Sequence, residues 1–279
     1  MEKYTGYFDI KLNDSQLAQL YNGEKLEYLD LYKPYENQYA IIKNEEDKII
    51  DIYRYQNNEY KQVGYNNIEN SYDSKIKPKN DEQRMAIDLL KNHNIGIKLL
   101  KGVYGSGKDF LMLNYALECL EKGKFQKIVF IRPNVTVADV PDIGYLKGSV
   151  FEKLSWTLGP LYDKVGGEEG VQRLMNMGQL ELAPLSFIRG RSFDDSIVYV
   201  SEGQNITSEI AKLLISRIGN NSELWINADN HQADSRIYIQ DNGINKMIDR
   251  LKGQALFGTV YLSKTERGKI ANLANLLDN

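Results

Sequence analysis

The sequence predicts an α/β protein with a parallel sheet and helices on both faces, preceded by a small, mostly β domain. From about residue 80 onward, short apolar runs alternate with segments whose apolar residues recur at helical spacing, which is typical of parallel strands joined by helices. Several of these runs are followed at once by a polar cluster. The 279 residues, of which 42% are hydrophobic, suit one large domain with a smaller companion.

The first 75 residues form the predicted accessory domain. They hold twelve of the 19 tyrosines, in short alternating runs separated by Asn, Glu and Lys, which indicates strands and turns. We expect a helix at 14–20 and strands at 39–42 and 48–55, joined by a hairpin connection. Tyrosines that fill a small β core are favoured over tyrosines that stack on nucleic-acid bases. Residues 70–80 are polar and contain a proline, so we place a linker there.

The second predicted domain covers residues 76–279. Asn80 is placed to cap its first helix, where apolar residues recur at helical spacing. Further helices are expected at 110–120, between 150 and 182, and at the C-terminal end. Five apolar runs are the predicted strands, at 97–100, 127–131, 197–200, 223–227 and 259–262.

Polar clusters follow four of these strands. They are the Gly-rich loop after 97–100, the pair Ser201-Glu202, the stretch 229–232, and Arg267. Ligands of open parallel sheets bind at the carboxyl ends of the strands. The sequence therefore predicts one site built from all four clusters.

The Gly-rich loop has the spacing of a phosphate-binding loop. Gly102, Gly107 and Lys108 stand as Gly-x4-Gly-Lys between an apolar run and a helical segment. Glycines permit the tight turn, backbone N–H groups face phosphate oxygens, and the lysine neutralises the terminal phosphates. The next residue is normally Ser or Thr, whose hydroxyl binds the magnesium ion of the nucleotide. Here it is Asp109.

The second domain resembles the PhoH-like ATPases, a family related to superfamily 1 helicases. The matching motifs lie in order at Gln83, 102–108, 132–133, 142–148, 152–153, 188–192, 202–205, 216–219, 229–234 and 266–267. The resemblance implies a RecA-like P-loop NTPase core that binds and hydrolyses ATP with Mg²⁺. It also implies a homo-oligomeric ring, with a hexamer favoured, and a helicase-like action on single-stranded RNA or DNA. The nuclease domain of some members does not fit into the first 75 residues, so RNA cleavage is not expected.

The resemblance also implies roles for single residues. The nucleotide-binding residues would be Gln83 at the adenine, then Gly102, Val103, Tyr104, Gly105, Ser106, Gly107, Lys108, Asp109 and Phe110. The catalytic residues would be Lys108, Glu202, Gln232, Arg189, Arg191, Arg217 and Arg267. Glu202 would polarise the attacking water and Gln232 would sense the γ-phosphate. The arginines would stabilise transition-state charge, in their own chain or in a neighbouring subunit, with a surface ion pair as the alternative for each.

Two positions depart from the family in a reciprocal way. The family has Ser or Thr in place of Asp109, and an aspartate in place of Ser201. Both positions normally face the magnesium ion. The site of this chain therefore still has one carboxylate and one hydroxyl, but each stands at the position where the family has the other. We predict a compensated Mg²⁺ site in which Asp109 lies within reach of Ser201, and a retained, slow ATPase. In the opposing interpretation, Asp109 repels the phosphates, and the chain is an inactive, nucleotide-binding, ring-forming interaction protein.

The amino-acid composition limits the classes of protein to which the chain can belong. A net charge of −3 gives no global basic field of the kind that marks many nucleic-acid binders. One cysteine and two histidines exclude a disulfide framework and make a zinc site improbable. No apolar run reaches the length of a membrane span. We expect a cytoplasmic protein, of a bacterium or a phage-infected host, with no membrane partner.

Overall fold

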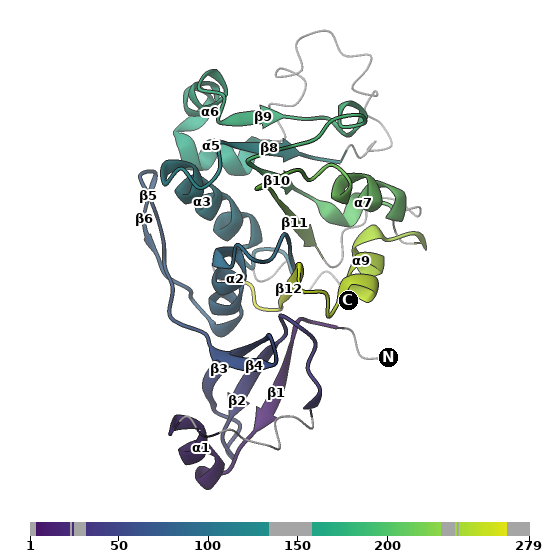
Figure 1. Cartoon of the computed structure of the whole chain (residues 1–279). Helices are drawn as coiled ribbons and strands as arrows, with labels where there is room; N and C mark the ends of the chain where they lie inside the picture. Colours follow the sequence, from purple (N-terminus) through teal and green to yellow (C-terminus); the bar gives the residue numbers. More distant parts are fainter. Residues whose placement is uncertain are drawn as a thin grey trace.

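The computed structural model describes residues 4–22, 24, 32–133, 158–229, 238 and 240–266. These residues contain a six-stranded sheet, a four-stranded sheet and a two-stranded hairpin (Figure 1). No helix in this part of the chain is long and apolar enough to cross a membrane. The helix expected at the C-terminal end lies outside the described residues.

The six-stranded sheet is entirely parallel, which confirms the predicted fold class. Its strands are β7 (Ile97–Gly102), β8 (Lys127–Ile131), β9 (Leu180–Leu182), β10 (Ser196–Val200), β11 (Glu223–Asp229) and β12 (Phe257–Leu262). Their order across the sheet is β12-β7-β11-β10-β8-β9. Strand β9 lies in the stretch 150–182, which was expected to be helical, because three residues at a sheet edge are too few to show a strand periodicity.

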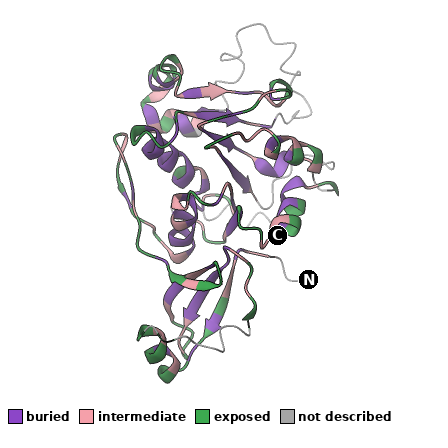
Figure 2. Cartoon of the chain, in the orientation of Figure 1, coloured by how far each residue is buried: buried purple, intermediate pink, exposed green. Residues whose placement is uncertain are grey.

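Helices cover both faces of this sheet (Figure 1). The helices α2 (Asp81–Lys91), α3 (Lys108–Glu121), α5 (Gly159–Val165) and α6 (Gly167–Asn176) lie on one side, and α7 (Ser208–Ile215) and α9 (Gly243–Leu251) on the other. Alternate strand residues enter the two cores, so Tyr199 packs with α3 whereas Val198 packs with α7. The central strands are buried on both faces (Figure 2), which explains their continuous apolar sequence.

The N-terminal domain is a four-stranded sheet with one short helix. It consists of β1 (Tyr7–Lys11), α1 (Asp14–Tyr21), β2 (Tyr39–Lys43), β3 (Ile49–Gln56) and β4 (Glu59–Gln62). The expected helix, both expected strands and their hairpin are present, and β1 is an addition that pairs in parallel with β2. Its buried residues are aliphatic, among them Ile10, Leu12 and Ile42. Tyr39 is the one fully buried tyrosine among the described residues up to 75, so the expected tyrosine core is wrong.

Residues 70–80 do not form the expected linker. A hairpin of β5 (Ile68–Asn70) and β6 (Asp73–Ile76) occupies most of this stretch and packs along α3. The backbone N–H of Glu69 donates to Glu118 on α3 at 2.7 Å. Side-chain hydrogen bonds from Asn70 to α3 fix the turn in the same way, so the polar residues that suggested a linker are the ones that dock it.

Buried ion pairs join the N-terminal sheet to α2. Arg84 of α2 pairs with Asp51 at 2.8 Å, and Arg54 of β3 pairs with Asp88. Tyr39 also donates a hydrogen bond to Asp88 at 2.9 Å. The charges are thus paired across the boundary, although the Nε atoms of Arg54 and Arg84 have no hydrogen-bond partner among the residues that the structure describes.

Candidate functional site

The Gly-rich loop connects β7 to α3 in a conformation that its glycines permit. Gly107 has φ +93° and stands at the N-cap of α3, so the helix begins at Lys108. A side chain at Gly102 would collide with the backbone of Leu262, because its Cβ would lie 2.2 Å from that carbonyl oxygen. The loop thus combines a left-handed turn with a close strand contact, both of which require glycine.

Lys108 is folded onto its own loop. Its ammonium group donates to the carbonyl oxygens of Gly102 at 3.1 Å and Val103 at 2.7 Å. It also lies 3.5 Å from a carboxylate oxygen of Asp229 at the end of β11. Burial lowers the pKa of Lys108, and the Asp229 carboxylate opposes that shift. The lysine is therefore a buried cation held at the loop by weak carbonyl contacts and a long ion pair.

Segments from both sides hold the loop in place. Gln83 donates to the carbonyl of Ser106 at 3.0 Å and accepts from the backbone N–H of Lys79 at 3.0 Å. The backbone N–H of Glu266 donates to the carbonyl of Gly105 at 3.0 Å. Gln83 is thus at the predicted site, but its amide supports the loop here, and adenine recognition stays a prediction.

The loop opens into a cleft of about 630 Å³ at the carboxyl end of the sheet. Its walls come from the loop, β6, α5 and the ends of β10 and β11. The lining residues that carry charge are Asp73, Lys75, Lys77, Lys79, Lys108, Asp109, Asp163, Lys164, Glu202, Asp229 and Glu266. Phe110 of the cleft wall lies under the ammonium group of Lys164, 3.9 Å from the ring centre to the nitrogen. The lining holds five lysines and six carboxylates, so an anionic ligand would pair with the lysines only together with a cation at the carboxylates, and the Phe110 ring offers a flat, apolar contact.

Glu202 faces the same cleft from the end of β10. It adopts a left-handed backbone with φ +56°, which turns its side chain out of the strand direction. Its carboxylate lies 3.6 Å from Arg132 and accepts a hydrogen bond from Gln204 at 2.7 Å. Gln204 in turn accepts from the backbone N–H of Asp229 at 2.8 Å. Gln204 therefore ties Glu202 to the neighbouring strand, a role that its motif alone does not reveal.

Asp109 contacts a residue that the sequence analysis missed. The hydroxyl of Tyr199 on β10 donates a hydrogen bond to Asp109 Oδ1. Burial raises the pKa of Tyr199 well above its usual value, and the Asp109 carboxylate raises it further, so the phenol stays a donor. Tyr199 precedes Ser201 by two residues and shares its face of the sheet. That spacing is the signal that could have identified it.

Ser201 lies at the predicted strand end but makes no hydrogen bond with Asp109 in the described part of the chain. Its side chain is 2% exposed, and its backbone N–H donates to the carbonyl of Ile131 at 3.0 Å. A metal ion between Asp109 and Ser201 remains a prediction.

The oxygen atoms of the cleft side chains could bind a magnesium ion only together with oxygen atoms of a bound ligand and of water. Asp109, Asn227 and Asp229 supply oxygen atoms to the cleft, and Asn227 Oδ1 is buried without a hydrogen-bond partner. The described residues contain no cluster of three or more carboxylate, histidine or cysteine side chains that could hold a metal by itself. Magnesium ordinarily takes one or two carboxylates together with phosphate and water oxygens, and the cleft offers that arrangement.

Three of the four predicted arginines lie away from the cleft of their own chain. Arg189 and Arg217 line a separate pocket of about 440 Å³ beside α7, and Arg191 pairs with Glu181 at 2.5 Å. None of the three lines the phosphate-loop cleft of its own chain. Two further predicted residues, Gln232 and Arg267, lie outside the described residues, as do the motifs at 142–148 and 152–153.

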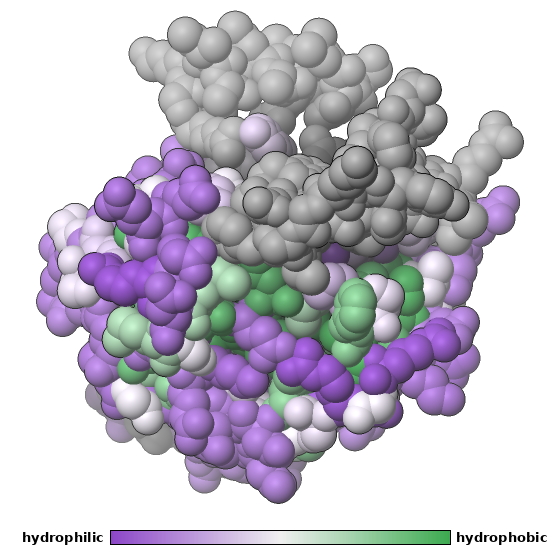
Figure 3. Space-filling model, turned by 90° about the horizontal axis from the view of Figure 1, so that it is seen from above, coloured by the Kyte–Doolittle hydropathy of each residue, from purple (hydrophilic) through white to green (hydrophobic). Residues whose placement is uncertain are grey.

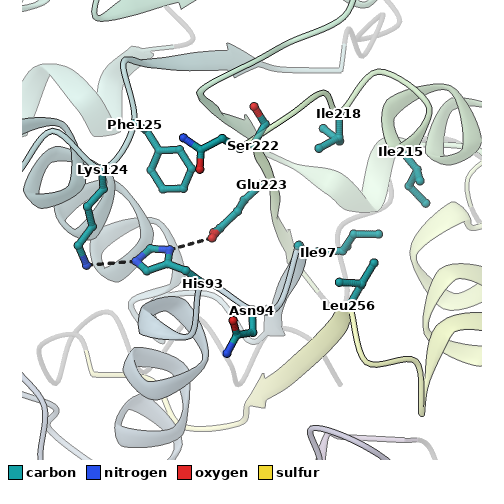
Figure 4. A pocket seen from close by; sticks show the side chains of 12 residues that line it. His93, Asn94, Ile97, Lys124, Phe125, Ile215, Ile218, Ser222, Glu223 and Leu256 are labelled. Carbon is teal, nitrogen blue, oxygen red and sulfur yellow. Dashed lines mark hydrogen bonds and ion pairs between the residues drawn. The ribbon is translucent and has the colours of Figure 1, made fainter.

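A second pocket, of about 620 Å³, lies at the opposite, amino end of the sheet. Figure 4 shows its ionic wall, where His93 points at Glu223 from one side and Lys124 approaches His93 from the other. The remaining wall is largely apolar, with Ile97 and Leu256 among its residues. No predicted site residue lies there.

Comparisons with known proteins give a consistent result. The sequence profile of a family described as PhoH-like protein matches residues 75–274. Protein PhoH2 of Bacillus subtilis is 31% identical over 290 residues, covering 98% of this chain and 64% of that protein. Protein PhoH2 of Mycolicibacterium smegmatis is 36% identical over 202 residues, covering 71% of this chain and 46% of that protein. The chain thus spans about half to two thirds of the length of these relatives.

A solved structure resembles the fold only distantly. The Pif1 helicase of Candida albicans superposes with a TM-score of 0.36 and 11% identity, over 72% of this chain and 44% of that one. A resemblance at this level supports no inference about activity.

Proposed function

Because the chain belongs to the PhoH-like protein family, whose P-loop fold binds nucleotides, we propose that it binds ATP with Mg²⁺ in the phosphate-loop cleft and hydrolyses it. The observation that carries the proposal is that Lys108 and Glu202 line one cleft from different strand ends. One is a cation suited to phosphates, and the other is a carboxylate suited to polarising water. The five lysines of the cleft offer partners for phosphate oxygens, and its six carboxylates call for a cation such as Mg²⁺ beside the nucleotide.

Each side chain has a defined task in this proposal. Lys108 exchanges its two loop carbonyls for phosphate oxygens, which are stronger acceptors because they are charged. Glu202, oriented by Gln204 and Arg132, polarises the attacking water. The Asp109 carboxylate and the Ser201 hydroxyl take the two protein positions beside Mg²⁺, which, when bound, neutralises charge on the β- and γ-phosphates.

The test is magnesium-dependent phosphate release by the purified chain and by a variant that carries Asp109→Thr together with Ser201→Asp. We expect slow release from the unaltered chain and comparable release from the double variant, since both hold one carboxylate and one hydroxyl. Lys108→Ala serves as the inactive control. Activity that appears only in the double variant would show that the exchange is not compensated.

Assembly into a ring is the second part of the proposal. Arg189 and Arg217 are placed beside α7, away from their own cleft, which supports a role toward the nucleotide of a neighbouring subunit. Figure 3 shows apolar groups gathered between hydrophilic areas on the face above α6 and β9. In this part of the chain Met177 and Phe187 are 62% and 64% exposed, which is favourable for a subunit contact. Mass measurements with and without nucleotide test the oligomer.

Single-stranded RNA or DNA is the proposed partner of the ring. The exposed tyrosines of the N-terminal domain, such as Tyr65 at 76% exposure, support this part because bases stack on aromatic rings. A binding titration across salt concentrations tests it, and a motor should also hydrolyse ATP faster when the nucleic acid is present.

The second candidate function is a ring-forming interaction protein that keeps nucleotide as a structural ligand. The observation that favours it is the carboxylate of Asp109 in the cleft wall next to Lys108, because that charge repels phosphate unless a cation lies between them. Nucleotide binding without phosphate release, and without stimulation by nucleic acid, would identify this function.

A further inference from the structure

We propose that Tyr199 is a positioning residue that holds the Asp109 carboxylate in place for the metal ion. This inference rests on the proposed function, in which Asp109 supplies the carboxylate of the Mg²⁺ site. Tyr199 would thus be a third residue of this site, besides the exchanged pair Asp109 and Ser201. Its hydroxyl on β10 would hold the Asp109 carboxylate at the start of α3 in one orientation.

The anchor of this contact is rigid. Tyr199 is fully buried in β10, a strand with neighbours on both sides, and its ring packs against Phe130 with 5.4 Å between ring centres. Its hydroxyl reaches Asp109 Oδ1 in the first turn of α3. A side chain locked in the sheet core therefore sets the orientation of a half-exposed carboxylate at the cleft.

The chemistry of the contact favours a metal ligand over a closed ion pair. A phenol donates one hydrogen bond and carries no charge, so Asp109 keeps its negative charge for a cation. The neighbouring lysine, Lys108, pairs with Asp229 at 3.5 Å, and no ion pair to Asp109 occurs among the described residues. Metal-ligating carboxylates are commonly held in this way by an outer hydrogen bond.

The surroundings support a ligand at this point. Val200 is in register with Ile226 on β11, so the next pair along the two strands places Ser201 beside Asn227. Asn227 is 4% exposed, lines the cleft, and leaves its Oδ1 without a partner. An unsatisfied buried oxygen next to the Tyr199–Asp109 contact is the environment that a hard cation or its waters would complete.

A buried tyrosine with a purely structural hydroxyl is present in the same layer and serves as the matched control. Tyr115 of α3 is also fully buried, and its hydroxyl lies 3.0 Å from His93 at the amino end of the sheet. Tyr115→Phe and Tyr199→Phe each remove one buried hydroxyl with little change of shape. The two variants differ in the partner of the lost hydrogen bond, which is the cleft residue Asp109 for Tyr199 and His93 for Tyr115.

The experiment measures binding of a fluorescent ADP analogue across Mg²⁺ concentrations, and binding of Mn²⁺ by electron paramagnetic resonance in the presence of ADP. We expect Tyr199→Phe to raise the metal concentration at half-saturation about 10-fold, the lower end of the effect of losing an outer-shell hydrogen bond. Tyr115→Phe should change it less than about 2-fold. In the background of Asp109→Thr with Ser201→Asp, Tyr199→Phe should also change it less than about 2-fold, because the carboxylate has moved.

The outcomes separate the two proposals. Equal effects of Tyr199→Phe and Tyr115→Phe, or a 10-fold effect of Tyr199→Phe that persists in the exchanged background, would overturn the positioning role alone. An unaltered chain that binds the analogue without any dependence on metal would overturn the proposed function and this inference with it. Thermal unfolding of each variant identifies a loss that comes from misfolding, and Tyr199→Trp, which keeps a donor at a different reach, then replaces Tyr199→Phe with the same expected loss.

Discussion

The two ends of strand β11 carry buried charges in opposite states of pairing. At the amino end, Glu223 accepts from His93 at 2.8 Å, from Lys98 at 2.5 Å and from Trp225 at 2.6 Å. Lys98, which is fully buried, also donates to the carbonyl of Leu90 at 2.7 Å. Figure 4 shows one part of this network, the contact of His93 with Glu223, at the wall of the pocket. The Glu223 carboxylate and the Lys98 ammonium group thus have their partners inside the protein.

The carboxyl end is incompletely satisfied. Lys108 donates to two loop carbonyls, lies 3.5 Å from the Ser106 hydroxyl and forms a long ion pair of 3.5 Å to Asp229, and Asn227 Oδ1 has no partner. Buried polar groups are normally hydrogen-bonded, so the contrast separates a stability site from a ligand site. Burial lowers the pKa of both Lys98 and Lys108, which shows that a perturbed lysine alone does not distinguish them.

The largest expected effect is on stability at the amino end. Lys98→Met leaves the Glu223 carboxylate in the core without its cation, and losing one partner of a buried pair costs about 3–5 kcal/mol. Urea unfolding measures the loss, and nucleotide affinity should stay within about 2-fold. A fall in affinity as large as that of Lys108→Met would mean that the two ends are not independent.

The next effect is on turnover at the carboxyl end. Glu202→Gln keeps the shape of the side chain and its contact with Gln204 but removes the base that polarises water. We expect phosphate release to fall by about 100-fold or more with nucleotide affinity nearly unchanged. Glu59→Gln, which alters an exposed carboxylate on β4 outside the cleft, is the control and should leave the rate unchanged.

Lys108→Met provides the counterpart to Lys98→Met. Loss of a charged hydrogen-bond donor to phosphate should weaken nucleotide binding by about 10- to 100-fold, measured by titration calorimetry. The free energy of unfolding should change less than it does in Lys98→Met, because the ion pair of Lys108 with Asp229 is longer, at 3.5 Å, than the 2.5 Å pair of Lys98 with Glu223. A destabilisation equal to that of Lys98→Met would assign Lys108 to the core.

The smallest effect concerns the acid sensitivity of the carboxyl half of α3, where Glu118 lies. Burial opposes ionisation of Glu118, but hydrogen bonds from Lys122 and from the backbone N–H of Glu69 hold its pKa below the ordinary value of 4.5. A lowered pKa stabilises the fold above pH 4.5, and this contribution disappears as the pH falls through the folded-state pKa. Glu118→Gln should cost about 1–2 kcal/mol at pH 7.

The measurement for Glu118→Gln is urea unfolding at a series of pH values. The difference from the unaltered chain should shrink below pH 4.5. A difference that stays constant down to pH 3 would show that the carboxylate charge does not hold the β5–β6 hairpin on α3.

Much of this architecture was accessible from local pattern. The strands around Val198 and Leu224 are short apolar runs, and Gly107-Lys108 marks a turn into a helix, so element type and the loop follow from neighbouring residues. The expected linker at 70–80 and the expected tyrosine core were wrong for a common reason. Polar and aromatic residues give the same sequence pattern whether their side chains face solvent or pack against another element. Only the packing of the folded chain decides between these two environments.

The candidate site divides in the same way. Local pattern was enough to assign Lys108, Glu202 and the exchanged pair Asp109 and Ser201 to strand ends, because the end of a strand and the residue that follows it are local properties. Three further facts depend on the folded arrangement of the strands: β11 lies between β7 and β10, Gln204 bridges two strand ends, and Tyr199 contacts Asp109. Contacts between residues 90 positions apart depend on strand order and register, which no local pattern specifies.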